Sequence, residues 1–322
     1  MRHWACRGAL AWLLWPVSLV FGLVVVFRRL FYRLHLFNSY NAGIPVIVVG
    51  NLTAGGSGKT PLVLRIVEML REQRWKPGIV SRGYGGDAQR PREASIASDP
   101  AEVGDEPILL ARRSGCPVWV APERGAACRA LRAQHPQCDV IVTDDGLQHY
   151  ALRRDIEICV VDGRGFGNGF LQPAGPLREP RSRLRSVDAV VTHGFSGLKG
   201  FEMKLEGEKF VNLSNAGEVR AAKSFAGQRV HAVAGVGDPK RFFLQLGRFG
   251  LKVVPHPYPD HHRFRAEDLK FGDSDPVVMT EKDAVKCKRF AQAHHWVFPV
   301  SASLDPAFGR WLQERLGGSK TA

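Results

Sequence analysis

The stretch GNLTAGGSGKTP (50–61) contains the residue types that proteins use to bind phosphate groups. Its glycines let backbone N–H groups approach an anion closely, and the start of a following helix adds the positive end of its dipole. Lys59 is placed to reach the β and γ phosphates of a nucleotide, and the Thr60 hydroxyl to bind Mg²⁺. The residues expected to contact the nucleotide are Thr53, Ala54, Gly55, Gly56, Ser57, Gly58, Lys59 and Thr60.

The sequence on both sides of this turn predicts the strand–loop–helix unit that a phosphate loop requires. Val46–Val49 is an apolar run typical of a buried strand, and apolar residues recur at helical spacing from Leu62 to Leu70. The generic pattern GxxxxGK[ST] has glycine where this chain has Thr53, so the match is not strict. Because the strand, the glycines and the Lys-Thr pair are all present, we expect a nucleotide-phosphate site here.

A second apolar run supplies carboxylates for a metal ion. The sequence DVIVTDD (139–145) predicts a strand that ends at Asp144 and Asp145. Ligands of parallel α/β sheets bind at the carboxyl ends of the strands, where the phosphate loop also lies. The alternative is a polar turn without a binding role. We expect Asp144 and Asp145 to lie with the Thr60 hydroxyl around Mg²⁺.

A kinase also needs a base close to its acceptor hydroxyl, and two segments contain candidates. Asp105 lies at the start of the helix predicted for GDEPILLARR (104–113), and His261 lies beside a carboxylate in YPDHHRF (258–264). Each has a structural alternative, since Asp105 is also suited to cap its helix and His261 to lie in a solvated loop. Candidates for binding the nucleotide base are Gly235–Pro239 and Thr280–Asp283.

Strands and helices alternate along the first two thirds of the chain. This alternation predicts an α/β fold, a P-loop NTPase-type parallel sheet with helices on both faces. Several of the predicted strands end in a polar or charged residue, as a site at the sheet edge requires. Besides the two strands already named, the predicted strands are Gly78–Ser81, Pro117–Ala121, Ile156–Val161 and Ala189–Thr192.

The pattern changes after about residue 198. FEMKLEGEKFVNL (201–213) predicts short antiparallel strands that act as a connector, and later apolar runs predict a smaller α/β unit. The last helix, which contains Phe308 and Leu316, fits either domain. We therefore divide the chain into an N-terminal membrane-anchor helix (1–36), a phosphate-loop core (37–197) and a smaller C-terminal domain with connector strands (198–322).

The N-terminal segment predicts a membrane anchor. From Ala9 to Phe27 there are 19 consecutive residues without a charge. As a helix they span roughly 28 Å, close to the hydrocarbon thickness of a bilayer. Trp12 and Trp15 near one end and Arg28 after the other are residue types found at membrane interfaces. A cleaved signal peptide and a buried core helix are the alternatives.

Composition narrows the class of partner. The chain of 322 residues has 45 Lys+Arg against 31 Asp+Glu, a net charge of +14, which favours an anionic partner. Such a surplus suits nucleic acid, an acidic membrane surface or a phosphorylated substrate. We expect no nucleic acid, because basic residues interleaved with aromatics do not form a recognisable module. The six cysteines form no CxxC pair, so we expect reduced thiols and neither a zinc site nor a disulfide framework.

These motifs together resemble one family, the tetraacyldisaccharide 4′-kinases, which phosphorylate a lipid A precursor during lipopolysaccharide synthesis. The resemblance runs over nearly the whole chain, including the hydrophobic N-terminus, and within the family the loop also departs from the generic first glycine. The segments that carry it are GNLTAGGSGKTP (50–61), SRGYGG (81–86), VGDEP (103–107), TDDGLQH (143–149), PAGPLRE (173–179), PDHHRF (259–264) and TEKDA (280–284).

The resemblance implies a reaction and roles for the candidate residues. It implies ATP with Mg²⁺ as donor and the 4′-hydroxyl of an acylated glucosamine disaccharide 1-phosphate as acceptor. It assigns Asp105 and His261 to a dyad that activates this hydroxyl, and Asp144 and Asp145 to the metal region. Since the dyad residues lie in different predicted domains, the cleft between the domains must close over the substrate. Residues matched to acceptor contacts are Arg82, Tyr84, His149, Arg178 and Glu179.

An acylated acceptor stays in the bilayer, so the resemblance places the enzyme at the cytoplasmic face of the bacterial inner membrane, in contact with its lipids. The basic cluster Arg178, Arg181, Arg183 and Arg185 would serve that face, grip the acceptor's phosphate, or form a solvated loop. We expect no obligate protein partner. The rival interpretations are a membrane-tethered regulatory NTPase and a nucleic-acid-binding ATPase.

Overall fold

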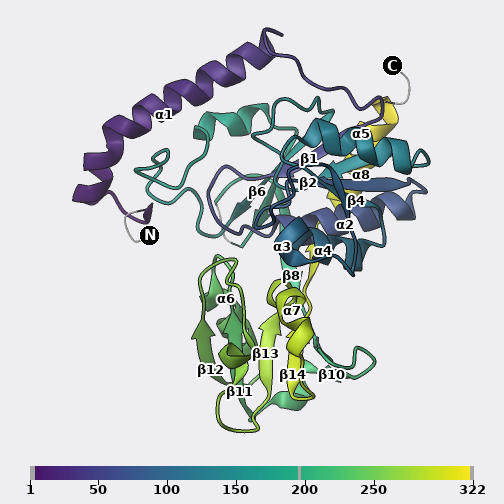
Figure 1. Cartoon of the computed structure of the whole chain (residues 1–322). Helices are drawn as coiled ribbons and strands as arrows, with labels where there is room; N and C mark the ends of the chain where they lie inside the picture. Colours follow the sequence, from purple (N-terminus) through teal and green to yellow (C-terminus); the bar gives the residue numbers. More distant parts are fainter. Residues whose placement is uncertain (1–3, 195–196, 320–322) are drawn as a thin grey trace.

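The computed structural model describes residues 4–194 and 197–319, and its larger sheet contains the predicted phosphate loop (Figure 1). Within these residues the sheet has nine strands in the order β15-β8-β7-β6-β1-β5-β2-β4-β3. Its strands are β1 (Val46–Gly50), β2 (Pro77–Ser81), β3 (Arg92–Ala94), β4 (Val118–Val120), β5 (Val140–Thr143), β6 (Ile156–Asp162), β7 (Ala189–His193), β8 (Phe201–Glu206) and β15 (Ser301–Leu304).

The centre of this sheet is parallel and buried, as the runs of β-branched residues predict. Strand β1 lies between β5 and β6, with Val48 opposite Thr143 in one ladder and opposite Glu157 in the other. Helices cover both faces, so that the core forms two hydrophobic layers. They are α2 (Lys59–Glu72), α3 (Pro100–Val103), α4 (Asp105–Ser114), α5 (Arg124–Gln134) and α8 (Pro306–Ser319). The predicted α/β fold with helices on both faces is confirmed.

The smaller sheet has six strands in the order β10-β9-β14-β13-β11-β12 in the part of the chain that the structure describes. Its later strands run parallel, and β9 and β10 are antiparallel at one edge. The strands are β9 (Lys209–Asn212), β10 (Val219–Ala221), β11 (Arg229–Ala234), β12 (Lys252–Pro257), β13 (Val277–Thr280) and β14 (His295–Phe298), with helices α6 (Pro239–Arg248) and α7 (Glu281–Cys287).

The segment predicted as an antiparallel connector is divided between the two sheets. The strands of FEMKLEGEKFVNL do not pair with each other, because β8 lies in the larger sheet and β9 in the smaller one. Strand β15 returns to pair with β8, and α8 follows it onto the larger domain, where Phe308 and Leu312 are buried. The chain therefore crosses between the sheets twice. The division at residue 198 stays a prediction. Strand β15 and helix α8 are exceptions to it, because they follow residue 198 in the chain but lie in the larger domain.

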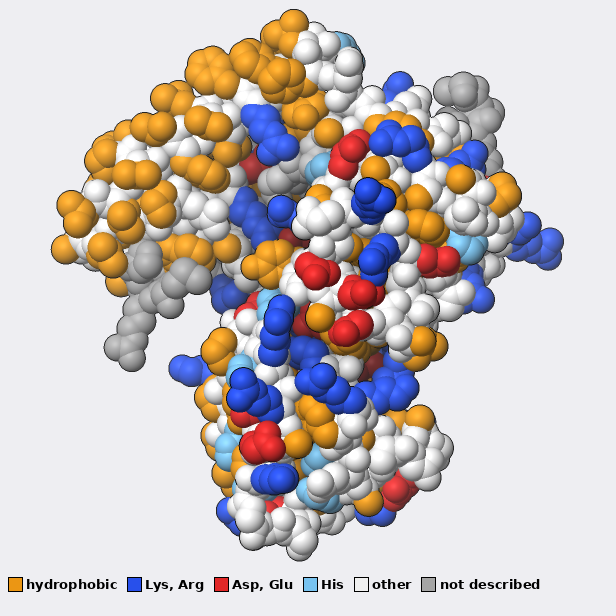
Figure 2. Space-filling model, in the orientation of Figure 1, with side chains coloured by type: hydrophobic (Ala, Val, Ile, Leu, Met, Phe, Trp, Pro, Cys, Tyr) orange, Lys and Arg blue, Asp and Glu red, His pale blue; other side chains and the backbone are white. Residues whose placement is uncertain are grey.

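Helix α1 (Ala9–Arg33) is long and apolar enough to cross a membrane, and it lies along the outside of the larger domain (Figure 1). Most of its apolar side chains are exposed, and hydrophobic atoms cover this part of the surface in Figure 2. The core-helix alternative is therefore wrong. One narrow face docks on the loop before residue 177: the Ser18 hydroxyl donates to the Leu171 carbonyl and accepts from the Ala174 N–H, both at 2.9 Å.

Candidate active site

The phosphate loop has the geometry that its sequence predicts. It connects β1 to α2, which begins at Lys59 after Gly58. Gly58 has φ +85°, a left-handed conformation that glycine adopts without steric cost. The Ser57 hydroxyl is buried without a hydrogen-bond partner. A Cβ at Gly237, in the base-binding candidate Gly235–Pro239, would lie 2.8 Å from the Gly56 nitrogen, so this segment touches the loop across the domain cleft.

The structure brings the predicted metal residues together beside this loop. Thr60 Oγ1 donates to Asp144 Oδ2 at 3.2 Å, and Lys59 Nζ lies 3.5 Å from Asp145 Oδ1. Burial raises the pKa of Asp144 to about 7, and the Glu106 carboxylate adds to the effect. Its other oxygen, Oδ1, is buried without a hydrogen-bond partner. A hydroxyl and a buried carboxylate with a free oxygen fit the oxygen ligands that Mg²⁺ prefers.

Asp145 lies in the opposite electrostatic environment. Arg178 donates from one guanidinium nitrogen to both Asp145 oxygens, at 2.9 and 3.0 Å. Burial acts to raise the pKa of Asp145, but Lys59 and Arg178 outweigh it and lower that pKa to about 2. This carboxylate is therefore ionised and fully engaged at neutral pH, and it orients Lys59 and Arg178 at the mouth of the loop.

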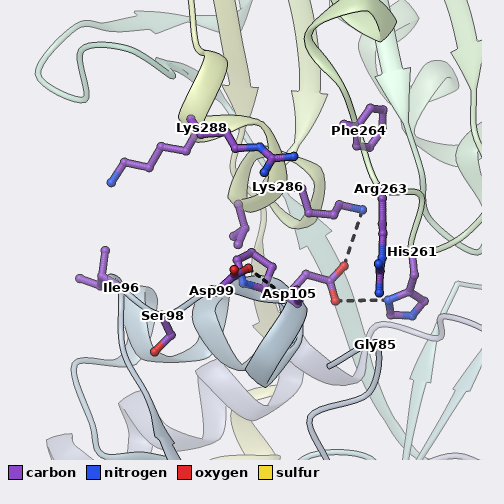
Figure 3. A pocket seen from close by; sticks show the side chains of 14 residues that line it. Gly85, Ile96, Ser98, Asp99, Asp105, His261, Arg263, Phe264, Lys286 and Lys288 are labelled. Carbon is purple, nitrogen blue, oxygen red and sulfur yellow. Dashed lines mark hydrogen bonds and ion pairs between the residues drawn. The ribbon is translucent and has the colours of Figure 1, made fainter. Parts of the chain in front are cut away.

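Asp105 and His261, which are 156 residues apart, meet across the domain cleft (Figure 3). Asp105 is the first residue of α4 and is 4% exposed, and its Oδ1 lies 3.2 Å from His261 Nδ1. The hydrogen bond to Asp105 raises the pKa of His261, whereas burial and Lys282 oppose the rise. Burial acts to raise the pKa of Asp105, but the hydrogen bond to His261 and the charge of Lys282 outweigh burial and lower it. The pair is thus a carboxylate held by an imidazole.

The dyad forms one wall of a cavity of about 690 Å³ between the two domains. Helix α7 supplies the opposite wall, with Lys286 Nζ 3.6 Å from Asp105 Oδ2 (Figure 3). The base-binding candidate Thr280–Asp283 reaches the dyad through Lys282, whose Nζ lies 3.1 Å from His261 Nε2. Basic side chains in the cavity wall are Arg263, Lys286, Lys288 and Arg289.

The five predicted acceptor residues differ in exposure: Arg82 and Tyr84 are exposed, His149 and Arg178 are half-buried, and Glu179 is buried. The Tyr84 ring lies 4.8 Å from the His261 ring, so Tyr84 is beside the dyad. His149 accepts from the Arg124 N–H at 3.3 Å, and burial, Arg124 and further arginines lower its pKa to about 3. Glu179 is 1% exposed and accepts hydrogen bonds from Gln148 and Tyr150, so it lies beneath the surface.

Arg124 is a buried residue at this edge that the sequence analysis missed. Its guanidinium donates to the Asp145 carbonyl at 2.6 Å and to the Asp144 carbonyl at 3.4 Å, which fixes the backbone of both acids. The signal was weak, because an arginine that opens a helix after a short strand is usually solvated. Arg164 was also missed; it contacts Asp162 and the Gly56 carbonyl and so braces the phosphate loop.

The basic cluster predicted for the membrane or the acceptor separates into different roles. Arg183 is 2% exposed and binds Glu157, Tyr150 and Ser186, so it stabilises the interior. Arg178 holds Asp145, and Arg181 lies over the Phe166 ring. The solvated-loop, membrane and phosphate interpretations are therefore wrong for Arg183.

The larger sheet carries a phosphate loop with a buried acid beside its threonine, and a carboxylate–imidazole pair lies in the cleft between the domains. These features define a P-loop phosphotransferase. A family model described as tetraacyldisaccharide-1-P 4′-kinase, LpxK, matches residues 10–317. The chain belongs to this family and is a lipid kinase.

Curated relatives and a solved structure agree with this assignment. A tetraacyldisaccharide 4′-kinase of Azoarcus sp. (strain BH72) is 50% identical over 321 residues, covering 98% of this chain and 94% of the relative. One of Nitrosococcus oceani is 51% identical over 311 residues, covering 96% and 91%. A crystal structure of LpxK from Aquifex aeolicus, in an "apo" form in complex with ATP, is 26% identical to this chain and has a TM-score of 0.81. The match covers 95% of this chain and 99% of that one.

Proposed function

We propose that this chain transfers the γ-phosphoryl group of ATP to the 4′-hydroxyl of a tetraacyldisaccharide 1-phosphate, a lipid A precursor in lipopolysaccharide synthesis. The observation that carries the proposal is the pairing of Asp105 with His261 beside the phosphate loop. A nucleotide hydrolase has no need of this pair, whereas a kinase needs a base at its acceptor hydroxyl.

The chain's own residues divide the work of the transfer. Lys59 and the amides of the loop bind and orient the phosphates of the donor. The Asp105 carboxylate accepts the proton of the 4′-hydroxyl while the oxygen forms its bond to the γ-phosphorus, and ADP leaves. His261 holds Asp105 in place through their hydrogen bond. Thr60 and Asp144 would hold Mg²⁺, which neutralises phosphate charge when bound.

The acceptor approaches from the side of α1. An open apolar groove of about 350 Å³ runs along α1 beside Arg28 and suits acyl chains. We assign Arg82, Tyr84, His149 and Arg178 to the polar part of the acceptor, with Glu179 supporting them from below. The apolar lining of the groove comes from Val20, Leu23, Val24, Phe27, Phe31 and Phe37.

The enzyme works at the cytoplasmic face of the bacterial inner membrane in this proposal. The exposed face of α1 enters the lipid, and ATP is available only on the cytoplasmic side. Contacts of α1 with the larger domain extend from the Ser18 hydroxyl to Arg29, which donates to Ser186 at 2.6 Å. Because α1 is docked along this length, it lies in the membrane surface beside the active site and does not need to cross the bilayer freely.

The test is ATP-dependent phosphate transfer to a tetraacyldisaccharide 1-phosphate in mixed micelles. Asp105→Ala and His261→Ala are each expected to lower kcat by about 100-fold or more, with ATP binding retained. His262→Ala is the matched control, because its imidazole contacts Asp268 and not the dyad, and it should stay close to wild type.

Two results would contradict the proposal. Hydrolysis of ATP by the wild type without phosphorylated lipid would indicate the membrane-tethered regulatory NTPase. Full transfer by both variants would mean that another group accepts the proton.

A further inference from the structure

Lys282, in the first turn of α7, contacts the dyad but has no role in the proposed reaction as described above. Its ammonium reaches three groups at the closed cleft: His261 Nε2 at 3.1 Å, Glu106 Oε1 at 3.0 Å and Asp260 Oδ1 at 3.2 Å. Glu106 belongs to the larger domain, and the other two belong to the smaller one. Lys282 thus contacts the imidazole of the dyad from the side opposite Asp105.

The local structure holds this lysine in place. Thr280 caps α7 by accepting from the Asp283 N–H at 3.2 Å, and its hydroxyl donates to Asp283 Oδ2 at 2.7 Å. The same carboxylate oxygen accepts from the Gly235 N–H at 2.9 Å, which fastens the first turn to the end of β11. The Lys282 side chain is 15% exposed. A lysine with little exposure and a fixed backbone has lost most of the conformational freedom that surface lysines keep.

Lys282 remains charged in this setting. Burial acts to lower its pKa, but Glu106, Asp105 and Asp260 outweigh burial and raise that pKa. An ammonium group has three donors and no acceptor. The nitrogen that faces it must therefore offer a lone pair, so that His261 Nε2 accepts and Nδ1 carries the ring proton.

We propose, resting on the proposed kinase reaction, that Lys282 is a positioning residue which holds His261 as the neutral tautomer protonated at Nδ1. This tautomer donates to Asp105 Oδ1 and leaves the carboxylate as the only proton acceptor of the pair. Lys282 and His261 belong to the same domain, whereas the bonds from Lys282 to Glu106 and from His261 to Asp105 cross the cleft. The dyad is therefore completed when the domains meet.

The groups that face the imidazole predict what loss of the lysine does. Asp105, Asp260 and Lys282 lie within 4 Å of the imidazole. Behind them, Glu106 binds Lys282 and Lys286 lies beside Asp105. The exposed Tyr84 ring lies against it and Arg263 is in the same cavity wall. Removing the Lys282 charge leaves the carboxylates in excess, so protonation of both His261 and Asp105 becomes easier. Activity that needs the unprotonated pair then requires a higher pH.

The experiment measures kcat for lipid phosphorylation from about pH 5 to pH 9 at saturating ATP and lipid, in wild type, Lys282→Met and Lys282→Arg. Lys282→Met is expected to move the acid limb of the profile upward by about one pH unit and to lower kcat below it. Lys282→Arg keeps the charge and the donor, so its acid limb should stay near that of wild type. Lys288→Met is the matched control, because this exposed lysine lines the same cavity.

Each outcome has one meaning. A Lys282→Met enzyme with a changed KM or melting temperature but an unmoved acid limb would show that the lysine only joins the domains, and would overturn the inference. An acid limb that moves equally in Lys288→Met would do the same, since any cavity charge would then suffice. Failure of the wild type to phosphorylate lipid would instead reject the proposed function.

Discussion

At the scale of single residues, Asp144 and Asp145 are neighbours in the chain but have different surroundings at the carboxyl edge of the larger sheet. Asp144 is 1% exposed with a free oxygen, whereas Asp145 is engaged by Lys59 and Arg178. The difference arises from direction: successive side chains after a strand point to opposite sides. Asp145 also has φ +50°, which turns the chain away from β5. In the proposed reaction Asp144 is therefore free to bind a metal ion, whereas Asp145 orients Lys59 and Arg178.

Arg183 should contribute more to stability than any other arginine of its cluster. Its guanidinium donates to Glu157 at 2.5 Å and to the Tyr150 hydroxyl at 3.1 Å, and Glu179 lies 3.8 Å away. Arg183→Leu would remove the cation beside the buried Glu179 and leave Glu157 with Arg154 alone, at a cost of about 3–5 kcal/mol. Chemical denaturation in detergent should detect this loss, and the exposed Arg185→Leu should change stability by less than about 0.5 kcal/mol. Equal stability of the two variants would refute the interior role of Arg183.

At the scale of elements, the strands that position the site were predictable and their partners were not. The apolar runs before Gly50 and Asp144 predicted β1 and β5 because each is flanked by a turn and buried on both faces. Local pattern could not show that β8 and β9 separate into different sheets, or that β15 returns to β8 from about a hundred residues away. Such pairings depend on tertiary packing, which periodicity does not encode.

Helix α1 offers a test of docking that is separate from its attraction to lipid. A Cβ at Gly22 would lie 2.7 Å from Leu171 Cδ1, so a larger side chain at this position must displace the Leu171 side chain or the helix. Gly22→Leu should push α1 off the loop while making the helix more apolar, and should lower lipid phosphorylation several-fold with ATP binding unchanged. Vesicle flotation and transfer assays together distinguish the effects, because membrane binding should persist.

Val17→Leu provides the control for this change. Val17 is 55% exposed on α1 and does not line the apolar groove, so the added methylene enters the surrounding lipid. If Gly22→Leu transfers phosphate as fast as Val17→Leu, α1 acts as a tether alone and its docked position does not matter.

At the scale of the whole molecule, the active site exists only when the two domains touch. Asp105 opens α4 of the larger domain and His261 lies in a turn of the smaller one, and their meeting could not be derived from the sequence because it depends on how the two domains pack. The chain crosses between the domains at β8–β9 and again at β14–β15, so two segments connect them. The cleft surfaces carry opposite charges where α4 meets α7.

The ion pair between Arg113 and Glu281 is the contact that should stabilise the closed form. Arg113 donates from one nitrogen to both Glu281 oxygens at 2.7 and 2.8 Å, and from the other to Ser301 at 3.0 Å. Arg113→Glu places two carboxylates against each other and should lower kcat about tenfold, because His261 then reaches Asp105 less often. Adding Glu281→Arg restores opposite charges, so the double variant should recover part of the loss, with a coupling energy of about 0.5–3 kcal/mol.

A charge reversal elsewhere in the larger domain is the control for this recovery. Arg65 pairs with Glu68 and Glu72 on the exposed side of α2, and Arg65→Glu should change kcat little. Raising the salt concentration should weaken the wild type toward the Arg113→Glu variant, since a partly exposed pair is screened. If Arg113→Glu and Glu281→Arg each matched wild type, the closed cleft would have to be held by substrate alone, and the ion pairs between α4 and α7 would be its consequence.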